Sequence, residues 1–415
     1  MNWDFLIKDK ASLCVSTDTR NLPAGCVFFA LHGERFDGNK FAKQALENGA
    51  SLAVIDNPEY ALQEGTLLVD NTLLALQELA HAWRCELGLP IIGVTGTNGK
   101  TTTKELLATV LSTKYNLHYT QGNLNNQIGV PLTLLQITHA HELAIVEMGA
   151  SHPGDIKELV DIAAPNYGLI TNVGRAHLEG FGSFEGVQRT KQELYDYLVA
   201  HNGTIFRNAD NPFLAAMENN ATQLYTTQHH STPCYTTLHH ATQLYTTGSM
   251  PSGTHLVGEY NAENVSAAIC VGEYFGIAPE QALEAIRQYV PTNNRSQKMQ
   301  TANNHLIVDA YNANPTSMQA AINAFKGDTY ILGAMRELGE YSHLEHQNIV
   351  NMLAERKADT VLLVGEEYMQ TTSPYPVFAD VEALHAYLEA HPLCGKAILL
   401  KGSRSTHMEK LLDIL

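Results

Sequence analysis

Basic residues are scarce in this sequence. Its 415 residues include 26 lysines and arginines against 43 aspartates and glutamates, which gives a formal net charge of −17. A protein that binds nucleic acid needs basic surface to displace counterions from phosphates. We therefore expect no nucleic-acid partner. An acidic enzyme can still bind a nucleotide where a local loop, a lysine and a metal bind its phosphates.

Paired cysteines and long apolar runs are also lacking. The six cysteines are scattered without a Cys-x-x-Cys pair, which is typical of a reducing compartment rather than of a disulfide framework. No stretch approaches the roughly 18 apolar residues of a membrane span. The first residues, MNWDFLIKDK, lack the basic start and apolar stretch of a signal peptide. We expect a soluble, cytoplasmic protein with no membrane insertion.

Apolar runs and helical patterns alternate along most of the chain, and this alternation predicts an α/β fold with mostly parallel sheets covered by helices. The length predicts two to four domains, and we place them at residues 1–86, 87–297 and 298–415. The expected strands are 27–31, 52–55, 91–94, 143–146, 169–173, 305–308, 330–332, 361–364 and 397–400. The expected helices are 41–48, 73–84, 104–111, 317–325, 347–356 and 381–390. Asn71 or Thr72 is a candidate cap for the second helix and Asn314 for the fourth, which has Pro315 in its first turn.

Residues 221–250 differ from the rest of the chain. The units LYTTQHH, CYTTLHH and LYTTGSM recur there at a ten-residue period. Tyrosine and threonine favour short strands, so we expect a solvated, β-rich surface segment. Its two His-His pairs, at 229–230 and 239–240, leave a metal site as the alternative, although no carboxylate or thiolate accompanies them at a ligand spacing.

The segment GVTGTNGKTT, residues 93–102, follows a predicted strand and precedes a predicted helix. Gly96 and Gly99 allow backbone N–H groups to curl around phosphates at a helix N-terminus. Lys100 supplies a positive charge to the terminal phosphates, and the Thr101 hydroxyl can bind Mg²⁺. The candidate nucleotide-binding residues here are Gly96, Thr97, Asn98, Gly99, Lys100, Thr101 and Thr102.

Two further strands deliver polar residues at their carboxyl ends, where ligands bind in open α/β sheets. Glu147 follows strand 143–146, and His177 follows strand 169–173. A carboxylate is a natural Mg²⁺ ligand and an imidazole an acceptable one. A lone histidine is more often a packed one, but its place beside a phosphate loop favours a ligand. The amide cluster 123–129 is either an Asn-rich turn or a site for polar substrate groups.

A family resemblance emerges from seven motifs taken in order. Over nearly the whole chain, these motifs resemble those of the Mur ligases. They are TGTNGKTTT, TQGNLNNQIGVPLTLL, EMGASHPGDI, ITNVGRAHLEGFGS, TKQEL, NNRSQ and VDAYNANPTSM. One branch of the family joins D-alanyl-D-alanine to UDP-N-acetylmuramoyl-tripeptide. The motifs of this branch are similar to YNANP, ILGAMRELG with the following His346, and LLKGSR in this sequence. The resemblance implies three domains: a UDP-substrate domain, a central P-loop ATPase and a Rossmann-like C-terminal domain. We expect ATP to convert the tripeptide carboxylate to an acyl phosphate that the dipeptide amine attacks, in a monomeric enzyme.

The resemblance also implies roles for single residues. Lys100 would bind the ATP β- and γ-phosphates. Thr101 and Glu147 would hold one Mg²⁺, and His177 a second. Lys191, in TKQEL, matches the lysine that CO₂ converts to an anionic carbamate at the metal site. Judged from its own surroundings in the sequence, Lys191 would be only a solvated helix residue.

Further positions follow from the same resemblance. Asn264 would lie near the adenine, Arg295 at the ATP phosphates and Asp309 at the ribose. The implied catalytic residues are Lys100, His177, Lys191 and Arg295. The implied substrate-binding residues are Ser16, Asp18, Thr19, Arg20, Gly33 and Asp37 at the UDP end, with Asn125, Asn126, Asn312 and Asn314.

Two other functions remain as alternatives. One is the family member that adds the third amino acid, whose Asp-Asn-Pro-Arg motif is absent, since the Asp-Asn-Pro runs at 56–58 and 210–212 lack the arginine. The other is a nucleotide-regulated binding protein that keeps the loop without the chemistry. This alternative is disfavoured because the sequence retains the residues expected to carry the chemistry, which are Lys100, Glu147, His177 and Lys191.

Overall fold

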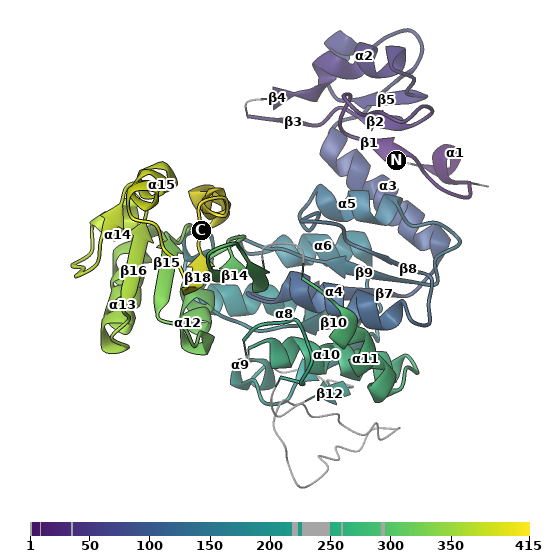
Figure 1. Ribbon diagram of the computed structural model, residues 1–415. Helices are drawn as coiled ribbons and strands as arrows, with labels where there is room; N and C mark the ends of the chain where they lie inside the picture. The colour runs from purple at the N-terminus through teal and green to yellow at the C-terminus, as the bar shows by residue number, and fades with distance from the viewer. Residues whose placement is uncertain are drawn as a thin grey trace.

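Three α/β lobes make up the computed structural model (Figure 1), which confirms the predicted fold class. It describes residues 2–8, 10–34, 36–217, 223–225, 250–258, 260–291 and 295–415. Figure 1 shows the N-terminal lobe above the central lobe and the C-terminal lobe beside it. Within the repeat segment 221–250, the structure describes β12 (Gln223–Tyr225) and Met250. Both His-His pairs lie outside the described residues.

The N-terminal lobe contains a parallel sheet in the order β1-β2-β5-β6 and a small hairpin of β3 and β4. Its strands are β1 (Val15–Ser16), β2 (Val27–Phe29), β3 (His32–Gly33), β4 (Phe36–Asp37), β5 (Leu52–Ile55) and β6 (Thr66–Leu68). Its helices are α1 (Asp4–Ile7), η1 (Gly38–Phe41), α2 (Ala42–Glu47), η2 (Pro58–Tyr60) and α3 (Thr72–Leu87). The Asn71 side chain accepts a hydrogen bond from Leu74 N at 2.8 Å, so Asn71 is the cap of α3. α3 packs against helices of the central lobe.

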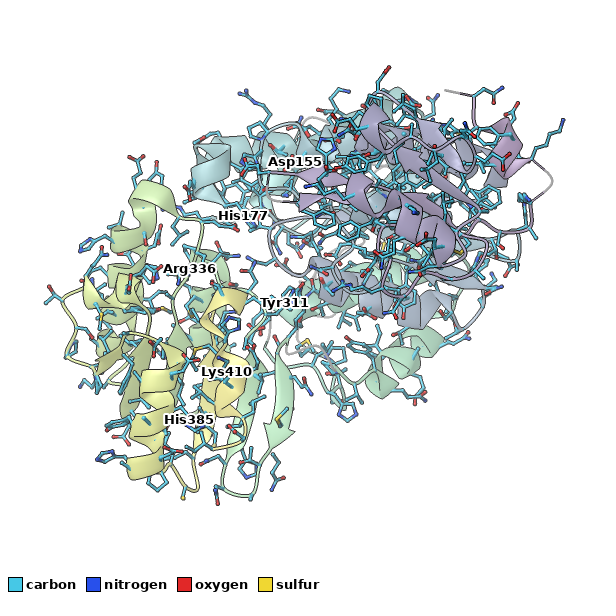
Figure 2. All side chains as sticks on the ribbon, turned by 90° about the horizontal axis from the view of Figure 1, so that it is seen from above. Asp155, His177, Tyr311, Arg336, His385 and Lys410 are labelled. Carbon is cyan, nitrogen blue, oxygen red and sulfur yellow. A yellow bond between two sulfur atoms is a disulfide. The ribbon has the colours of Figure 1, made fainter. Side chains whose placement is uncertain are left out.

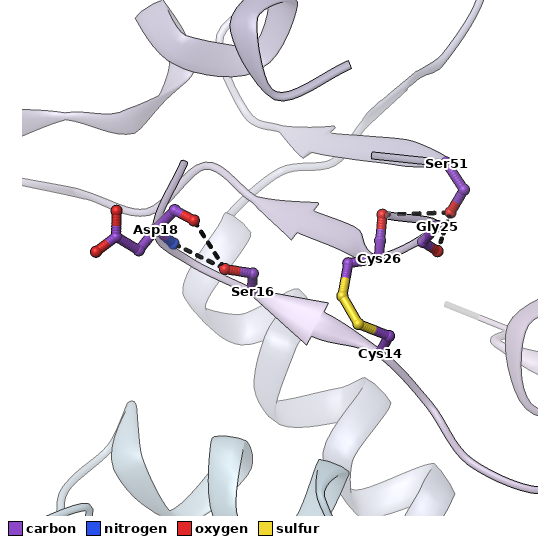
Figure 3. The surroundings of a disulfide bond; sticks show 6 residues. All are labelled: Cys14, Ser16, Asp18, Gly25, Cys26 and Ser51. Atoms are coloured by element: carbon purple, nitrogen blue, oxygen red, sulfur yellow. Dashed lines mark hydrogen bonds between the residues drawn. A yellow bond between two sulfur atoms is a disulfide. The ribbon is translucent and has the colours of Figure 1, made fainter. Parts of the chain in front are cut away.

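A disulfide joins Cys14 to Cys26 in this lobe (Figure 3). β1 and β2 pair in parallel with Val15 opposite Val27, so the residue before each strand is brought next to the other. The two Cα atoms are 4.5 Å apart, within the range of disulfides. The expectation of cysteines without disulfides is therefore wrong at this pair, because strand register is not visible in cysteine spacing. Cys85, Cys270 and Cys394 are free.

The central lobe is a six-stranded parallel sheet in the order β12-β11-β10-β7-β9-β8. Its other strands are β7 (Ile91–Thr95), β8 (Leu117–Tyr119), β9 (Leu143–Glu147), β10 (Tyr167–Ile170) and β11 (Thr204–Asn208). Its helices are α4 (Lys100–Leu111), α5 (Gly129–Leu135), α6 (Asp155–Ala163), α7 (Leu178–Phe181), α8 (Phe184–Ala200), α9 (Pro212–Ala215), α10 (Asn261–Tyr274) and α11 (Pro279–Gln288). Successive residues of β7 face opposite cores: Ile91 packs in the core that includes α3, and Ile92 in the core that includes α10. The strand order reverses around β7, which places a ligand-binding crevice at the carboxyl end of this strand.

The C-terminal lobe has the strand order β13-β14-β18-β15-β16-β17, with only β13 antiparallel to its neighbour. The strands are β13 (Gln297–Gln300), β14 (His305–Asp309), β15 (Thr329–Gly333), β16 (Thr360–Val364), β17 (Val377–Phe378) and β18 (Ala397–Lys401). The helices are α12 (Pro315–Ala324), η3 (Gly339–Tyr341), α13 (Ser342–Glu355), α14 (Glu366–Met369), α15 (Val381–Ala390), η4 (Arg404–Thr406) and η5 (Met408–Leu411). Asn314 caps α12 in a reciprocal capping box with Ser317, which confirms the predicted cap.

Candidate active site

A cavity of about 720 Å³ lies between the central and C-terminal lobes. The phosphate loop, the end of β9 and the start of α10 line it from the central lobe, and the ends of β14 and β18 line it from the C-terminal lobe. Figure 2 shows His177 and Tyr311 where the two lobes approach each other. The carboxyl ends of parallel strands from two sheets therefore face one space.

The phosphate loop between β7 and α4 requires its glycines. Gly96 has a φ of 144°, and a Cβ there would lie 1.9 Å from Thr171 Oγ1. Gly99 has a φ of 79° and precedes α4, and its Cβ would lie 2.7 Å from Asn264 Oδ1. Side chains other than hydrogen are thus excluded at both positions, and the loop backbone approaches its neighbours closely.

Lys100 is the first residue of α4 and curls back over the loop. Its Nζ donates to the carbonyl oxygens of Gly96 at 2.7 Å and Thr97 at 3.1 Å. Burial lowers the pKa of Lys100 to about 8; nearby Glu147 opposes this shift and Arg295 adds to it. A cation at a helix N-terminus beside exposed backbone N–H groups is suited to bind phosphate.

Glu147 ends β9 and is buried, with an exposed fraction of 1%. Its Oε1 accepts from Thr101 Oγ1 at 3.2 Å and from Asn125 Nδ2 at 2.8 Å. Its Oε2 is buried without a hydrogen-bond partner in the described part of the chain. A buried carboxylate oxygen normally has a partner, so this atom fits a metal ligand.

The surroundings of Glu147 suit one kind of metal ion. Among the described residues, no three or more His, Cys, Asp or Glu side chains gather into a metal-binding group. Mg²⁺ does not need such a group, because it takes one or two carboxylates together with water and substrate phosphates. The Thr101 hydroxyl and the Glu147 carboxylate match that donor set.

His177 connects the two lobes. It has a left-handed φ of 50° and directly precedes α7. Its Nδ1 contacts Glu337 of the C-terminal lobe, and this hydrogen bond lowers the pKa of the Glu337 carboxyl. Both side chains line the cavity.

Lys191 lies on α8 with an exposed fraction of only 2%, so the simple reading as a solvated lysine is wrong. Its Nζ lies 5.5 Å from the centre of the Phe181 ring. Burial lowers the pKa of Lys191 well below its ordinary value, and the charge of Lys100 adds to this. The described residues that line the cavity do not include Lys191.

The residues expected at the adenine (Asn264), the ATP phosphates (Arg295) and the ribose (Asp309) all line the cavity. The Asn264 amide accepts from Thr103 Oγ1 at 3.0 Å and donates to Asn261 Oδ1 at 2.8 Å. Asp309 accepts from Lys401 Nζ at 2.5 Å. The Arg295 guanidinium carbon lies 3.9 Å from the centre of the Tyr311 ring.

The expected substrate residues fall into separate groups. Asn125, Asn126 and Asn312 line the cavity, whereas Asn314 caps α12 and donates to Asn98 Oδ1 of the phosphate loop at 2.7 Å. The UDP-end candidates lie in the N-terminal lobe, outside the residues that line this cavity. There the Ser16 hydroxyl donates to the Asp18 carbonyl at 2.9 Å (Figure 3), and Arg20 pairs with Asp18. These six candidates are Ser16, Asp18, Thr19, Arg20, Gly33 and Asp37.

Sequence reasoning missed Tyr311, Glu337 and Lys401, which all line the cavity. Lys401 ends β18, and Tyr311 and Glu337 follow β14 and β15 by a few residues. The rule that ligands bind at the carboxyl ends of parallel strands applies to this sheet too and could have indicated all three.

Comparison with known proteins places the chain in a family. The family models of the Mur ligase family catalytic domain, the Mur ligase middle domain and the Mur ligase glutamate ligase domain match residues 14–84, 94–272 and 294–404. The UDP-N-acetylmuramoyl-tripeptide–D-alanyl-D-alanine ligase of Bacillus subtilis (strain 168) is 35% identical, with coverage of 97% of this chain and 92% of that protein. The chain belongs to the Mur ligase family. The Escherichia coli (strain K12) protein of the same name is 34% identical to this Mur ligase, over 97% of this chain and 93% of its own.

Solved structures resemble this Mur ligase along nearly its whole length. MurF from Acinetobacter baumannii superposes with a TM-score of 0.81 at 30% identity, covering 96% of this chain and 92% of that one. MurF from Thermotoga maritima, solved in complex with ADP, gives 0.82 at 26% identity and covers 98% of both chains. None of the helices in the described part of this Mur ligase has the length and apolar character to cross a membrane.

Proposed function

We propose that this Mur ligase uses ATP to join D-alanyl-D-alanine to UDP-N-acetylmuramoyl-tripeptide through an acyl phosphate, forming the UDP-MurNAc-pentapeptide precursor of peptidoglycan. The observation that carries the proposal is one cavity that joins a phosphate loop to the C-terminal lobe. It lies in a chain whose relatives with this activity in their name align over 97% of its length. We also propose domain bounds of 1–86, 87–297 and 298–415.

The reaction has two chemical steps. ATP phosphorylates the terminal carboxylate of the tripeptide, and the dipeptide amine then attacks the acyl carbon, so that phosphate leaves from a tetrahedral intermediate. Lys100 and Arg295 neutralise charge that develops on the phosphoryl group. Asn264 and Asp309 hold the nucleoside. Catalysis is chiefly positioning and electrostatic stabilisation.

Magnesium is part of the proposal. Thr101 and Glu147 would hold one Mg²⁺, and the unpartnered Oε2 of Glu147 supports this assignment. His177 would hold a second. The ions supply charge neutralisation at the ATP phosphates.

Lys191 would serve as a carbamate. Its lowered pKa favours the neutral amine, which is the form that reacts with CO₂. The nitrogen forms a bond to the carbon of CO₂ and loses a proton, so a cationic side chain becomes an anionic one. An anion there would support a metal near His177, where an ammonium would repel it.

The remaining assignments complete the proposal. The UDP end of the substrate would bind the N-terminal lobe at Ser16, Asp18, Thr19, Arg20, Gly33 and Asp37. The protein would act as a cytoplasmic monomer in cell wall biogenesis, and through it in cell shape and division.

Phosphate release from ATP tests the function. We expect release only when UDP-MurNAc-tripeptide and D-alanyl-D-alanine are both present, with formation of the pentapeptide product. If a single amino acid added to UDP-MurNAc-dipeptide supports release and the D-alanyl dipeptide does not, the enzyme adds the third residue instead. If neither acceptor supports phosphate release, the protein binds nucleotide without ligase chemistry.

A further inference from the structure

A second cavity, of about 480 Å³, adjoins the first. His177, Asn312 and Glu337 line both cavities, so the two spaces meet at these side chains. The other residues that line the second cavity are Ala176, Ala313, Asn314, Arg336, Ser403, Arg404, Ser405 and His407. The cavity therefore has an acidic side chain where it meets the phosphate-loop space and two guanidinium groups in its own part.

The two guanidinium groups differ in their partners. Arg336 pairs with the carboxylate of Glu367 and donates to Ser405 Oγ at 3.2 Å, so its charge is already matched. Arg404 is exposed at the start of η4 and has no carboxylate partner in the described part of the chain. Its guanidinium carbon lies 5.7 Å from the centre of the Tyr311 ring. Arg404 is thus a positioned, unneutralised cation in the second cavity.

We propose that Arg404 binds the terminal carboxylate of the dipeptide acceptor and makes the enzyme selective for a free acid. This inference rests on the proposed function. The acceptor carries an ammonium at one end and a carboxylate at the other. Its amine must reach the acyl phosphate in the first cavity, so the amine end belongs at the shared boundary, beside Glu337. The carboxylate then lies in the part that only the second cavity contains, where Arg404 is a cation without a carboxylate partner among the described residues.

The side-chain chemistry supports this orientation. A guanidinium donates two parallel N–H groups to one carboxylate, and such charge-assisted bonds are stronger than neutral ones. An acceptor whose carboxyl end is a neutral amide would lose this pairing. Loss of a hydrogen bond to a charged group corresponds to about a ten- to hundredfold weaker binding.

The test compares two acceptors, D-alanyl-D-alanine and D-alanyl-D-alaninamide, in the phosphate-release assay. The wild type should prefer the acid by about tenfold or more in kcat/KM. Arg404→Gln should raise KM for the acid by a similar factor, leave KM for ATP and UDP-MurNAc-tripeptide unchanged, and lose the preference. Arg404→Lys should keep part of it, because the positive charge remains. Lys410→Gln is the matched control: it removes a cation paired with Glu382 elsewhere in the lobe and should change none of these values.

Two results would overturn the inference while the proposed function stands. One is a wild type that uses the amide as well as the acid, and the other is an Arg404→Gln variant that keeps the full preference for the acid. A wild type that releases no phosphate with either acceptor would instead remove the proposed function, and the inference with it. Circular dichroism of each variant establishes that the fold is retained.

Discussion

Two lysines of the central lobe have pKa values that their surroundings lower. Burial lowers the pKa of Lys100 to about 8. Burial, and after it the charge of Lys100, lowers the pKa of Lys191 well below its ordinary value. Lys100 lines the cavity, where ATP phosphates would further stabilise its positive charge. Lys191 lies outside that lining, and its lowered pKa favours the neutral amine. The two residues are therefore suited to different tasks.

Lys191→Ala should be nearly inactive, because it would remove the proposed carbamate anion at the proposed metal site. Acetate added to the assay should restore part of the rate by supplying a carboxylate to the vacated space. CO₂-depleted buffer should slow the wild type, and bicarbonate should restore it. Phosphate release measures all three effects.

A second buried lysine provides the control. Lys104 is fully buried and donates to the Thr120 carbonyl at 2.7 Å, so Lys104→Ala should lose stability. Acetate should not improve the activity of that variant. If Lys191→Ala keeps full activity, Lys191 is only a packed lysine and has no role as a carbamate.

His118 should make stability depend on pH. Burial first, and then the charge of His141, lower the pKa of His118 to about 4. The unfolded state has the higher pKa and binds a proton first as the pH falls below about 6.5, so stability decreases between that value and about 4. At pH 5 the loss is at most about 2 kcal/mol. Urea unfolding at pH 7 and pH 5 should show a smaller difference for His118→Gln than for the wild type, and an equal difference would show that His118 does not contribute.

At the scale of elements, the sequence predicted the buried strands best. β7 and β9 contain the whole of their predicted ranges, IIGV and LAIV, which carry no polar side chain, and each strand ends one residue later, at Thr95 and Glu147. Helix starts were less predictable: α4 begins four residues and α13 five residues before their predicted starts. Their first turns, KTTT and SHLE, have few apolar residues and so carry little helical periodicity. The Cys14–Cys26 disulfide could not be predicted, because it depends on the register of β1 and β2.

The candidate site was predictable where it depends on strand ends and on family motifs. Glu147 ends β9 and His177 follows β10 of the same sheet, so the fold brings them to one edge. Contacts between the lobes were not predictable, because no local pattern records which residues of two separate sheets meet. The contact of His177 with Glu337 is of this kind.

The phosphate loop as an element can be tested at Gly96. Gly96→Ala should weaken ATP binding by more than tenfold and lower the melting temperature, because its Cβ would meet Thr171 Oγ1 at 1.9 Å. Gly88→Ala is the control, since Gly88 also has a positive φ, 62°, but no atom within 4 Å of the added Cβ. That variant should lose only about 1–2 kcal/mol of stability and bind ATP normally. Calorimetric titration with ATP and thermal unfolding distinguish them, and equal ATP affinity in both variants would contradict the close contact.

At the scale of the whole molecule, the cavity depends on how the central and C-terminal lobes meet. Asn98 and Asn314 exchange an amide hydrogen bond at 2.7 Å, and His177 contacts Glu337. Arg175 of the central lobe donates to Glu345 on α13 at 2.9 Å. Since the proposed ATP contacts come from both lobes, closing and opening of this boundary should accompany turnover.

Glu345→Gln tests whether the ion pair holds the lobes together. The Glu345 side chain is only 2% exposed, so its charge depends on Arg175 for compensation, and the glutamine keeps the shape without the charge. We expect a larger radius of gyration in solution scattering without ATP, and a several-fold higher KM for ATP with kcat unchanged. Glu382→Gln is the control, because its exposed pair with Lys410 lies within the C-terminal lobe. If both variants match the wild type in radius and in KM, the lobes are held by other contacts and the pair with Arg175 only neutralises a buried carboxylate.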